Sequence, residues 1–177
     1  MLRTQQIEAA QEFAKITVEA LKTRRGVHAE TAVAGVARMA GTYFFRSFGL
    51  PLSDIQPGQV VLSDKANENG PVLIEILGGA LTQIGVALDE GNLNSETSAE
   101  SQPNQSFLET QGLLEPRFIA IQERHGLSQQ EAAEACAVAT ALLIQYCSQV
   151  LDPNVAFDIA IYGFIEGAKT APDPVVL

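Results

Sequence analysis

Apolar positions recur every three to four residues along most of this chain, which is the spacing of an amphipathic helix. Residues 3–23 give the clearest case, with charged side chains on one face and apolar side chains on the opposite one. The pattern predicts an all-α fold, a single-domain bundle of about six helices. The expected helices cover residues 3–23, 29–48, 71–90, 106–126, 128–150 and 153–169.

Capping residues mark several of the helix ends. Ser106 with Glu109 and Ser128 with Glu131 have the spacing of a capping box. In this motif each of the two side chains accepts a hydrogen bond from the backbone N–H of the other residue. Pro116 lies inside the pattern of the fourth helix, where we expect it to kink or split that helix. The capping boxes therefore predict where the fourth and fifth helices begin.

The expected helices over 128–150 and 153–169 are apolar on nearly all faces, so we expect them to be central. Proline and glycine break the pattern between residues 50 and 70, which predicts a long irregular loop. Only residues 59–63 of that loop have the pattern of an extended segment. Residues 91–105 are almost wholly polar and predict a flexible loop.

Small residues line one face of the helix over 29–48 and one face of the helix over 71–90. Small side chains let two backbones approach each other, so we expect these two helices to cross at short distance. The residues are Ala34, Ala37 and Gly41 on the first helix, and Gly78, Thr82 and Gly85 on the second.

The chain of 177 residues has 11 Lys and Arg against 21 Asp and Glu, a formal charge of −10. Such a charge repels nucleic acids and anionic lipid over most of the surface, so we expect neither as a partner. The first fifty residues are basic, with seven cations against four acids, and the remainder is acidic. We expect the two parts to neutralise each other by packing together or across a dimer.

No secretory signal is visible at the start of the chain, so we expect a cytoplasmic protein. The most apolar stretch, Ala135 to Leu151, contains Gln and Ser, which favours a buried helix over a membrane span. Cys136 and Cys147 lie on this helix about 16 Å apart, too far for a disulfide bond. We therefore expect two buried, reduced thiols.

Two short segments resemble parts of known metal sites. His28-Ala29-Glu30 resembles the first half of the zinc nucleoside deaminase signature, in which the His binds zinc and the Glu moves protons. The second half, with two closely spaced cysteines, is absent, so His28 is interpreted as a residue at a helix entrance. Residues 64–70 resemble part of a calcium-binding loop. Ala66 and Glu68 stand at positions 3 and 5 of that pattern, so the segment is interpreted as an Asx-rich turn. We expect no metal and no cofactor.

Residues 122–134 resemble the first two helices of the repressor-type helix-turn-helix family, which implies a recognition helix in the major groove. Here the second helix continues as a hydrophobic rod, and no Lys or Arg follows until Lys169. The match reduces to a glycine stop followed by a serine cap, which also joins ordinary antiparallel helices.

Three charged residues, Arg38, Glu75 and Asp158, lie within apolar runs. Burying any of them alone is unfavourable by several kcal/mol, so each needs a partner, an exposed position or a cavity. We expect a structural ion pair between Arg38 and Glu75 across the close crossing. The alternatives are ordinary exposed positions and a ligand pocket that uses these groups.

Aromatic residues gather at the end of the second expected helix. Because they point in several directions around the helix, we expect one face to be core and another to form an interface with a second copy. The alternative is that the loop that follows folds back and covers them. The aromatic residues are Tyr43, Phe44, Phe45 and Phe48, and the same segment contains Arg46, Leu50 and Leu52.

Two functions follow as hypotheses. The first is a non-enzymatic helical protein that self-associates as a homodimer through Phe44, Phe45, Phe48, Leu50 and Leu52. The second is a small-molecule binder or enzyme with a pocket between the second and third helices, where the chain offers polar groups for a ligand. The candidate binding residues are Arg38, Tyr43, Arg46 and Glu75, and no catalytic residue is assigned.

Overall fold

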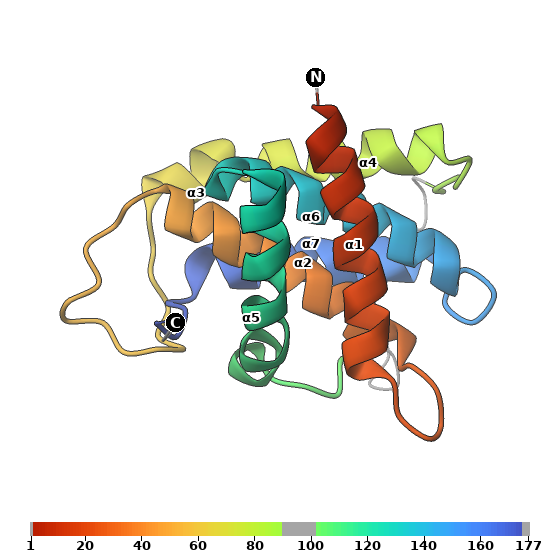
Figure 1. The fold of residues 1–177 in the computed structure, drawn as a ribbon, viewed down its shortest axis with the longest axis horizontal. Coiled ribbons are helices and arrows are strands. Elements are labelled where there is room, and N and C mark those ends of the chain that lie inside the picture. The colour runs from red at the N-terminus through yellow and green to blue at the C-terminus, as the bar shows by residue number, and fades with distance from the viewer. Residues whose placement is uncertain (1, 90–101, 175–177) are drawn as a thin grey trace.

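The computed structural model describes residues 2–89 and 102–174, and the regular structure in these ranges is helical apart from two isolated β-bridges (Figure 1). The predicted all-α bundle is confirmed. The predicted polar loop lies outside the described residues except for 102–105. The helices are α1 (Thr4–Leu21), α2 (Ala29–Ser47), α3 (Asp64–Asn69), α4 (Pro71–Gln83), α5 (Phe107–His125), α6 (Gln129–Cys147) and α7 (Pro153–Lys169).

Both predicted capping boxes are present at the starts of α5 and α6. Pro116 does not split α5, which continues through it. Proline clashes with the carbonyl four residues earlier and leaves it without a donor, and here that carbonyl belongs to Gly112. Both residues are exposed, so water can hydrate the free carbonyl and α5 stays in one piece.

Two boundaries differ from the sequence prediction. The helix α4 ends at Gln83, because Gly85 has a left-handed φ of 79° and the Val86 N–H donates to the Leu81 carbonyl at 2.9 Å. This is a Schellman motif, which stops a helix. The six-residue helix α3 occupies residues 64–69, where we expected an Asx-rich turn, and Ser63 caps its start. The rest of the predicted irregular loop, up to residue 63, contains no regular helix.

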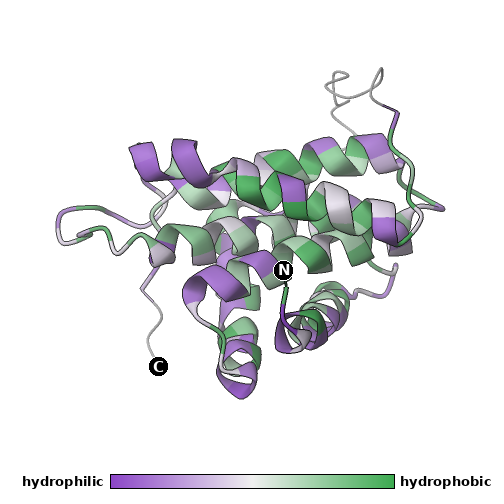
Figure 2. Cartoon of the chain, turned by 90° about the horizontal axis from the view of Figure 1, so that it is seen from above, coloured by the Kyte–Doolittle hydropathy of each residue, from purple (hydrophilic) through white to green (hydrophobic). Residues whose placement is uncertain are grey.

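The helix α2 is the most buried element, and α6, which the sequence predicted to be central, packs against α1, α2, α4 and α7. Sixteen of the nineteen residues of α2 are buried, against twelve of nineteen in α6. The helix α2 packs against α1, α5, α6 and α7. A helix of small residues accepts neighbours on all sides, whereas apolar content alone does not show how many neighbours it has. Seen from above, the hydrophobic parts of the helices lie in the middle of the molecule (Figure 2).

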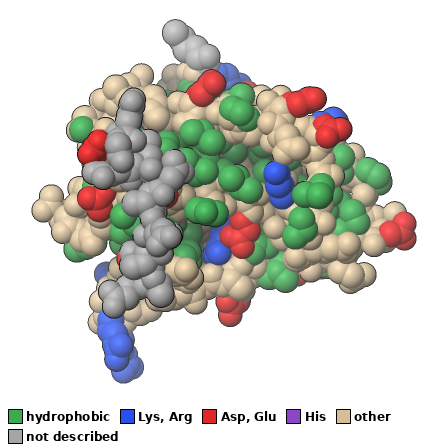
Figure 3. Space-filling view, turned by 180° about the vertical axis from the view of Figure 1, so that it is seen from behind, with side chains coloured by type: hydrophobic (Ala, Val, Ile, Leu, Met, Phe, Trp, Pro, Cys, Tyr) green, Lys and Arg blue, Asp and Glu red, His purple; other side chains and the backbone are tan. Residues whose placement is uncertain are grey.

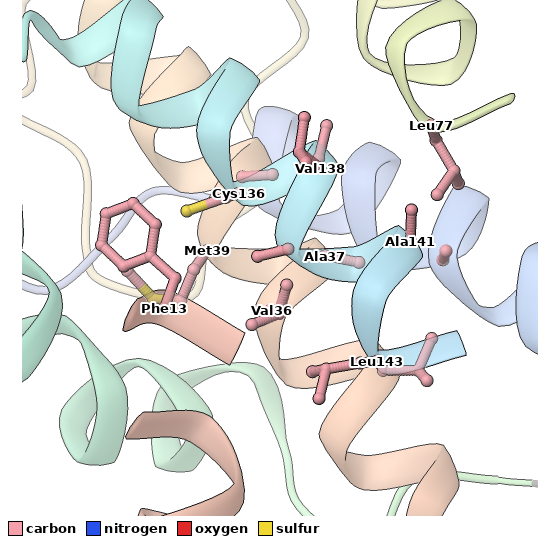
Figure 4. Packing of buried hydrophobic residues seen from close by; sticks show 14 of the residues in the cluster. Phe13, Val36, Ala37, Met39, Leu77, Cys136, Val138, Ala141 and Leu143 are labelled. Atoms are coloured by element: carbon pink, nitrogen blue, oxygen red, sulfur yellow. The ribbon is translucent and has the colours of Figure 1, made fainter. Parts of the chain in front are cut away.

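The core lies mainly between α2 and α6. Figure 4 shows Val36, Ala37 and Met39 of α2 among side chains of α6, with Phe13 entering from α1 and Leu77 from α4. All five of these side chains are fully buried. Small side chains such as Ala37 and large ones such as Phe13 and Met39 thus share one core, as expected of close packing.

The helix α6 contains both cysteines and much of the most apolar stretch of the sequence. Cys136 and Cys147 are buried and free, as predicted. Burial raises the pKa of both thiols above the ordinary value. Within residues 2–89 and 102–174, no helix combines the length and apolar content that a membrane crossing requires.

The closest helix crossing joins α2 to α7. A Cβ atom built on Gly41 would lie 2.5 Å from the Phe164 carbonyl oxygen and 2.6 Å from the Ala168 nitrogen. Gly163 and Gly167 of α7 face α2 with equally little space. The predicted crossing of α2 with the third expected helix is therefore wrong: the small face of α2 is used, but its partner is α7.

The small residues on α4 have a different environment. The helix packs on α6 through Leu73, Leu77 and Leu81, and nothing lies within 4 Å of a Cβ built on Gly78 or Gly79. Small residues permit close approach, but they do not select which helix approaches.

The predicted extended segment pairs with the chain that follows α7. Val60 forms an antiparallel bridge with Thr170, and the Val61 N–H donates to the Lys169 carbonyl at 2.7 Å. On the other side, the N–H of Ala171 donates to the Gln59 carbonyl at 2.9 Å. These bonds fasten the loop beside the carboxyl end of α7.

We expect Gly167→Ala to lower the free energy of unfolding by about 3 kcal/mol, because the new methyl overlaps the Arg38 carbonyl oxygen and forces the two helices apart. Gly79→Ala is the matched control, since its methyl meets nothing within 4 Å and removes a helix glycine; it should raise that free energy by about 0.5–1 kcal/mol. Urea denaturation followed by circular dichroism measures both. Equal stability of the two variants would show that the crossing is not tightly packed.

Candidate functional site

Arg38 lies in the middle of the central helix α2, and it is 9% exposed. Its Nε donates to Glu166 Oε2 of α7 at 2.6 Å. Its Nη1 donates to the Gln105 carbonyl at 2.8 Å and to Thr110 Oγ1 of α5 at 3.1 Å. One guanidinium thus joins α2, α7, α5 and the segment before α5.

The predicted ion pair between Arg38 and Glu75 is wrong. Glu75 is exposed on α4, which packs on α6, so its carboxylate is not the partner of Arg38. The partner is Glu166, because the close crossing of α2 with α7 brings their charged residues together. Asp158, the third charged residue in an apolar run, is buried at 5% exposure.

A cavity of about 280 Å³ lies beside this ion pair, between α2, α7 and residues 102–103. Within the described ranges, no acceptor bonds to Nη2 of Arg38, which retains two N–H donors. Tyr43, Arg46 and Glu75 lie outside this cavity, and Arg38 is the one predicted binding residue that lines it. The cavity is lined by Ala34, Arg38, Gln102, Pro103, Ile159, Tyr162, Gly163 and Glu166.

Arg46 belongs to a second, separate polar cluster. Its guanidinium donates to Glu115 Oε1 of α5 at 2.9 Å and to the Asp173 carbonyl at 3.0 Å. Gln111 donates to Glu115 Oε2 and exchanges two hydrogen bonds of 3.0 Å with the Asp173 backbone. The cluster fastens the segment after α7 to α2 and α5.

Glu115 is 2% exposed. Burial raises its pKa above the ordinary value, while the hydrogen bond from Gln111 and the charge of Arg46 act in the opposite direction. Tyr43 is buried nearby at 1% exposure, and burial raises its pKa as well. The Tyr43 hydroxyl has no hydrogen-bond partner in the described part of the chain. The expected convergence of Tyr43 with Arg38 and Glu75 does not occur.

The predicted interface on α2 requires correction. Phe44 and Phe45 are 4% and 1% exposed, because α2 is surrounded by other helices, so these two rings belong to the core. Phe48 packs on Phe44 with ring centroids 4.9 Å apart, and it is half-buried, as are Leu50 and Leu52.

An apolar groove of about 180 Å³ lies between α3, α4 and the carboxyl half of α7. Hydrophobic side chains gather over this side of the molecule, which is the face opposite to the view of Figure 1 (Figure 3). The groove is lined by Phe44, Ala66, Asn67, Gly70, Pro71, Leu73, Ile74, Phe164, Ile165, Ala168 and Lys169.

The sequence did not identify several residues that line the cavity and the groove. Glu166, Tyr162 and Ile165 belong to a helix that the sequence predicted to be central, so their exposure could not be read from hydrophobic periodicity. The spacing of Gly163 and Gly167, one helical turn apart, was the available signal for a close contact on α7.

His28 caps a helix, and it does not belong to a group of metal ligands in the described part of the chain. His28 Nδ1 accepts a hydrogen bond from the Thr31 N–H at 3.4 Å and caps α2, as predicted from its place at a helix entrance. No group of three or more His, Cys, Asp or Glu side chains with a metal-binding arrangement occurs among residues 2–89 and 102–174.

A pH titration of stability tests the environment of Glu115. A carboxyl group with a raised folded-state pKa adds stability below its unfolded value of about 4.5, and this contribution is lost as the pH rises through the folded pKa. We therefore expect the stability of the wild type relative to Glu115→Gln to fall as the pH rises above 4.5. Urea denaturation at a series of pH values measures this difference.

Glu123→Gln, at an exposed position of the same helix, is the control and should give a difference that changes little over the same range. A Glu115→Gln difference that stays flat, or grows with pH, would contradict a raised pKa.

Comparison of this chain with protein-family models, with curated proteins and with solved structures finds no match.

Proposed function

We propose that this chain is a non-enzymatic, cytoplasmic helical protein that self-associates as a homodimer, and that the contact lies on the face formed by α3, α4 and α7. The observation that supports this most is the apolar groove, which Ile165 of α7 lines at 47% exposure. Further exposed hydrophobic side chains lie on the same two helices, with Tyr162 of α7 70% exposed and Val72 of α4 37% exposed. Single exposed hydrophobic residues are ordinary, but a group around an apolar groove is typical of an interaction surface.

The central position of α2 buries Phe44 and Phe45, so the proposed contact lies beside the aromatic cluster, and Phe44 lines the base of the groove. The rings of Phe44 and Phe45 face other helices of the same chain. The outer face of α7 instead combines an exposed aliphatic side chain, Ile165, with an apolar groove beside it. A projecting side chain next to a groove is self-complementary under a two-fold axis.

Charge also favours a second copy as the occupant of the groove. The chain has a formal charge of −10, so two copies repel each other over most of their surface. Lys169 lies at the groove, whereas the exposed carboxylates of Glu68 and Glu75 lie on α3 and α4. The lining of the groove contains Lys169 and no carboxylate, so two copies that meet there repel each other less than at the acidic parts of the surface.

Sedimentation velocity tests the proposal with a matched pair of substitutions. Ile165 and Ile7 are both partly exposed, at 47% and 39%, but Ile7 lies on α1, outside the proposed contact. We expect the wild type and Ile7→Glu to sediment as dimers at about 50 µM, and Ile165→Glu to weaken dimerisation by about 100-fold because a charge is buried in the contact.

Circular dichroism spectra of all three proteins establish that each is folded. A wild type that remains a monomer at about 200 µM would overturn the proposed self-association. Equal weakening by Ile7→Glu and Ile165→Glu would place the contact elsewhere and overturn the proposed face.

A further inference from the structure

The cavity between α2 and α7 contains an unusual combination of groups for a structural ion pair. Its floor has a guanidinium that is held in place by three hydrogen bonds, and its rim has a carboxylate that is 40% exposed. The remaining lining side chains are mostly small or apolar. A cavity that combines apolar walls with few fixed polar groups is the usual form of a small-molecule site.

The fixed guanidinium of Arg38 offers recognition of an anionic group. Glu166, Gln105 and Thr110 occupy Nε and Nη1, so the side chain cannot turn away from the cavity. Nη2 keeps two N–H donors with no acceptor among residues 2–89 and 102–174. The two N–H donors of Nη2 point in different directions, so a carboxylate can accept one of them, and little entropy is lost because the guanidinium is already ordered.

The carboxylate of Glu166 offers recognition of a cationic group. Its Oε2 atom accepts the bond from Arg38 Nε, and its Oε1 atom accepts no hydrogen bond from the described part of the chain. A free anion would meet this carboxylate as well as the guanidinium, so a ligand with a negative charge alone is poorly matched. A ligand with an ammonium group next to its carboxylate satisfies both residues and leaves no uncompensated charge.

The size and walls of the cavity limit the rest of the ligand. Its volume of about 280 Å³ is at the low end for ligand pockets, which favours a small molecule. Ile159, Pro103 and the ring of Tyr162 supply apolar surface next to the charged pair. A short apolar side chain on the ligand would pack there.

We propose that the cavity between α2 and α7 binds a free α-amino acid with an apolar side chain, with its carboxylate on Nη2 of Arg38 and its ammonium group at Oε1 of Glu166. The exposed ring of Tyr162 covers the side chain of the ligand. The ion pair thus has two roles, since it links α2 to α7 and also presents one donor and one acceptor to the ligand.

Isothermal titration calorimetry on the full chain tests the proposal with L-leucine, L-isoleucine, L-valine and L-phenylalanine as probes. Two fragments of leucine accompany them: isocaproate, which lacks the ammonium group, and isoamylamine, which lacks the carboxylate. We expect at least one amino acid to bind, and each fragment to bind about tenfold more weakly or worse than leucine, since a charge-assisted hydrogen bond is lost.

If none of the four amino acids shows saturable binding up to about 10 mM, the proposal is overturned, because even a weak site is half-filled at that concentration. Isocaproate binding as tightly as leucine would also overturn it, since Glu166 would then have no role in recognition.

Variants separate a ligand site from a purely structural pair. Glu166→Gln should abolish the preference for leucine over isocaproate, because the charge that attracts the ammonium group is lost. Arg38→Lys should remove the affinity for both compounds, because a lysine side chain has one terminal nitrogen and no equivalent of Nη2. Tyr162→Ala should weaken leucine binding, while Tyr146→Ala, which removes an equally exposed tyrosine on α6, should not. Thermal unfolding of each variant establishes that it is folded. If Glu166→Gln and Arg38→Lys both bind leucine and isocaproate as the wild type does, the ion pair is structural alone and the proposal is overturned.

Discussion

The close approach of α2 and α7 is the constraint on which the other features of this structure depend. Gly41 on one helix and Gly163 and Gly167 on the other leave no room for a side chain between the backbones. Dispersion contacts are dense at such a distance, and they offset the conformational entropy that glycine loses in a helix. The contact makes α2 the central helix and brings Arg38 next to Glu166.

The ion pairs of the structure also link the first part of the chain to the remainder. The basic first part of the chain packs against the acidic remainder, and the pairs Arg3 with Glu131, Arg38 with Glu166 and Arg46 with Glu115 cross between them. The first is exposed and contributes little, whereas each of the other two has one buried member, Arg38 or Glu115, whose charge would be unfavourable without a partner. The expected neutralisation of the two parts therefore takes place within one chain.

The tight crossing also determines what remains on the surface. While α7 uses its glycine face for α2, its side chains Tyr162 and Ile165 are exposed, and Phe164 and Ile165 line the groove beside α4. The cavity lies on one side of this exposed ridge and the apolar groove on the other, and α7 lines both. One helix thus supplies the residues for a proposed ligand site and for a proposed contact between copies.

The sequence by itself determined the helices, most of their ends and the solvated face of α1, because periodicity, capping boxes and glycine stops act within a few neighbouring residues. It also determined that small residues on α2 would meet another backbone. Only the tertiary structure decided that the partner is α7, that Arg38 pairs with Glu166 and not with Glu75, and that Phe44 and Phe45 are core. Partner choice depends on how complementary surfaces from distant segments fit together, and no local pattern in the chain encodes that fit.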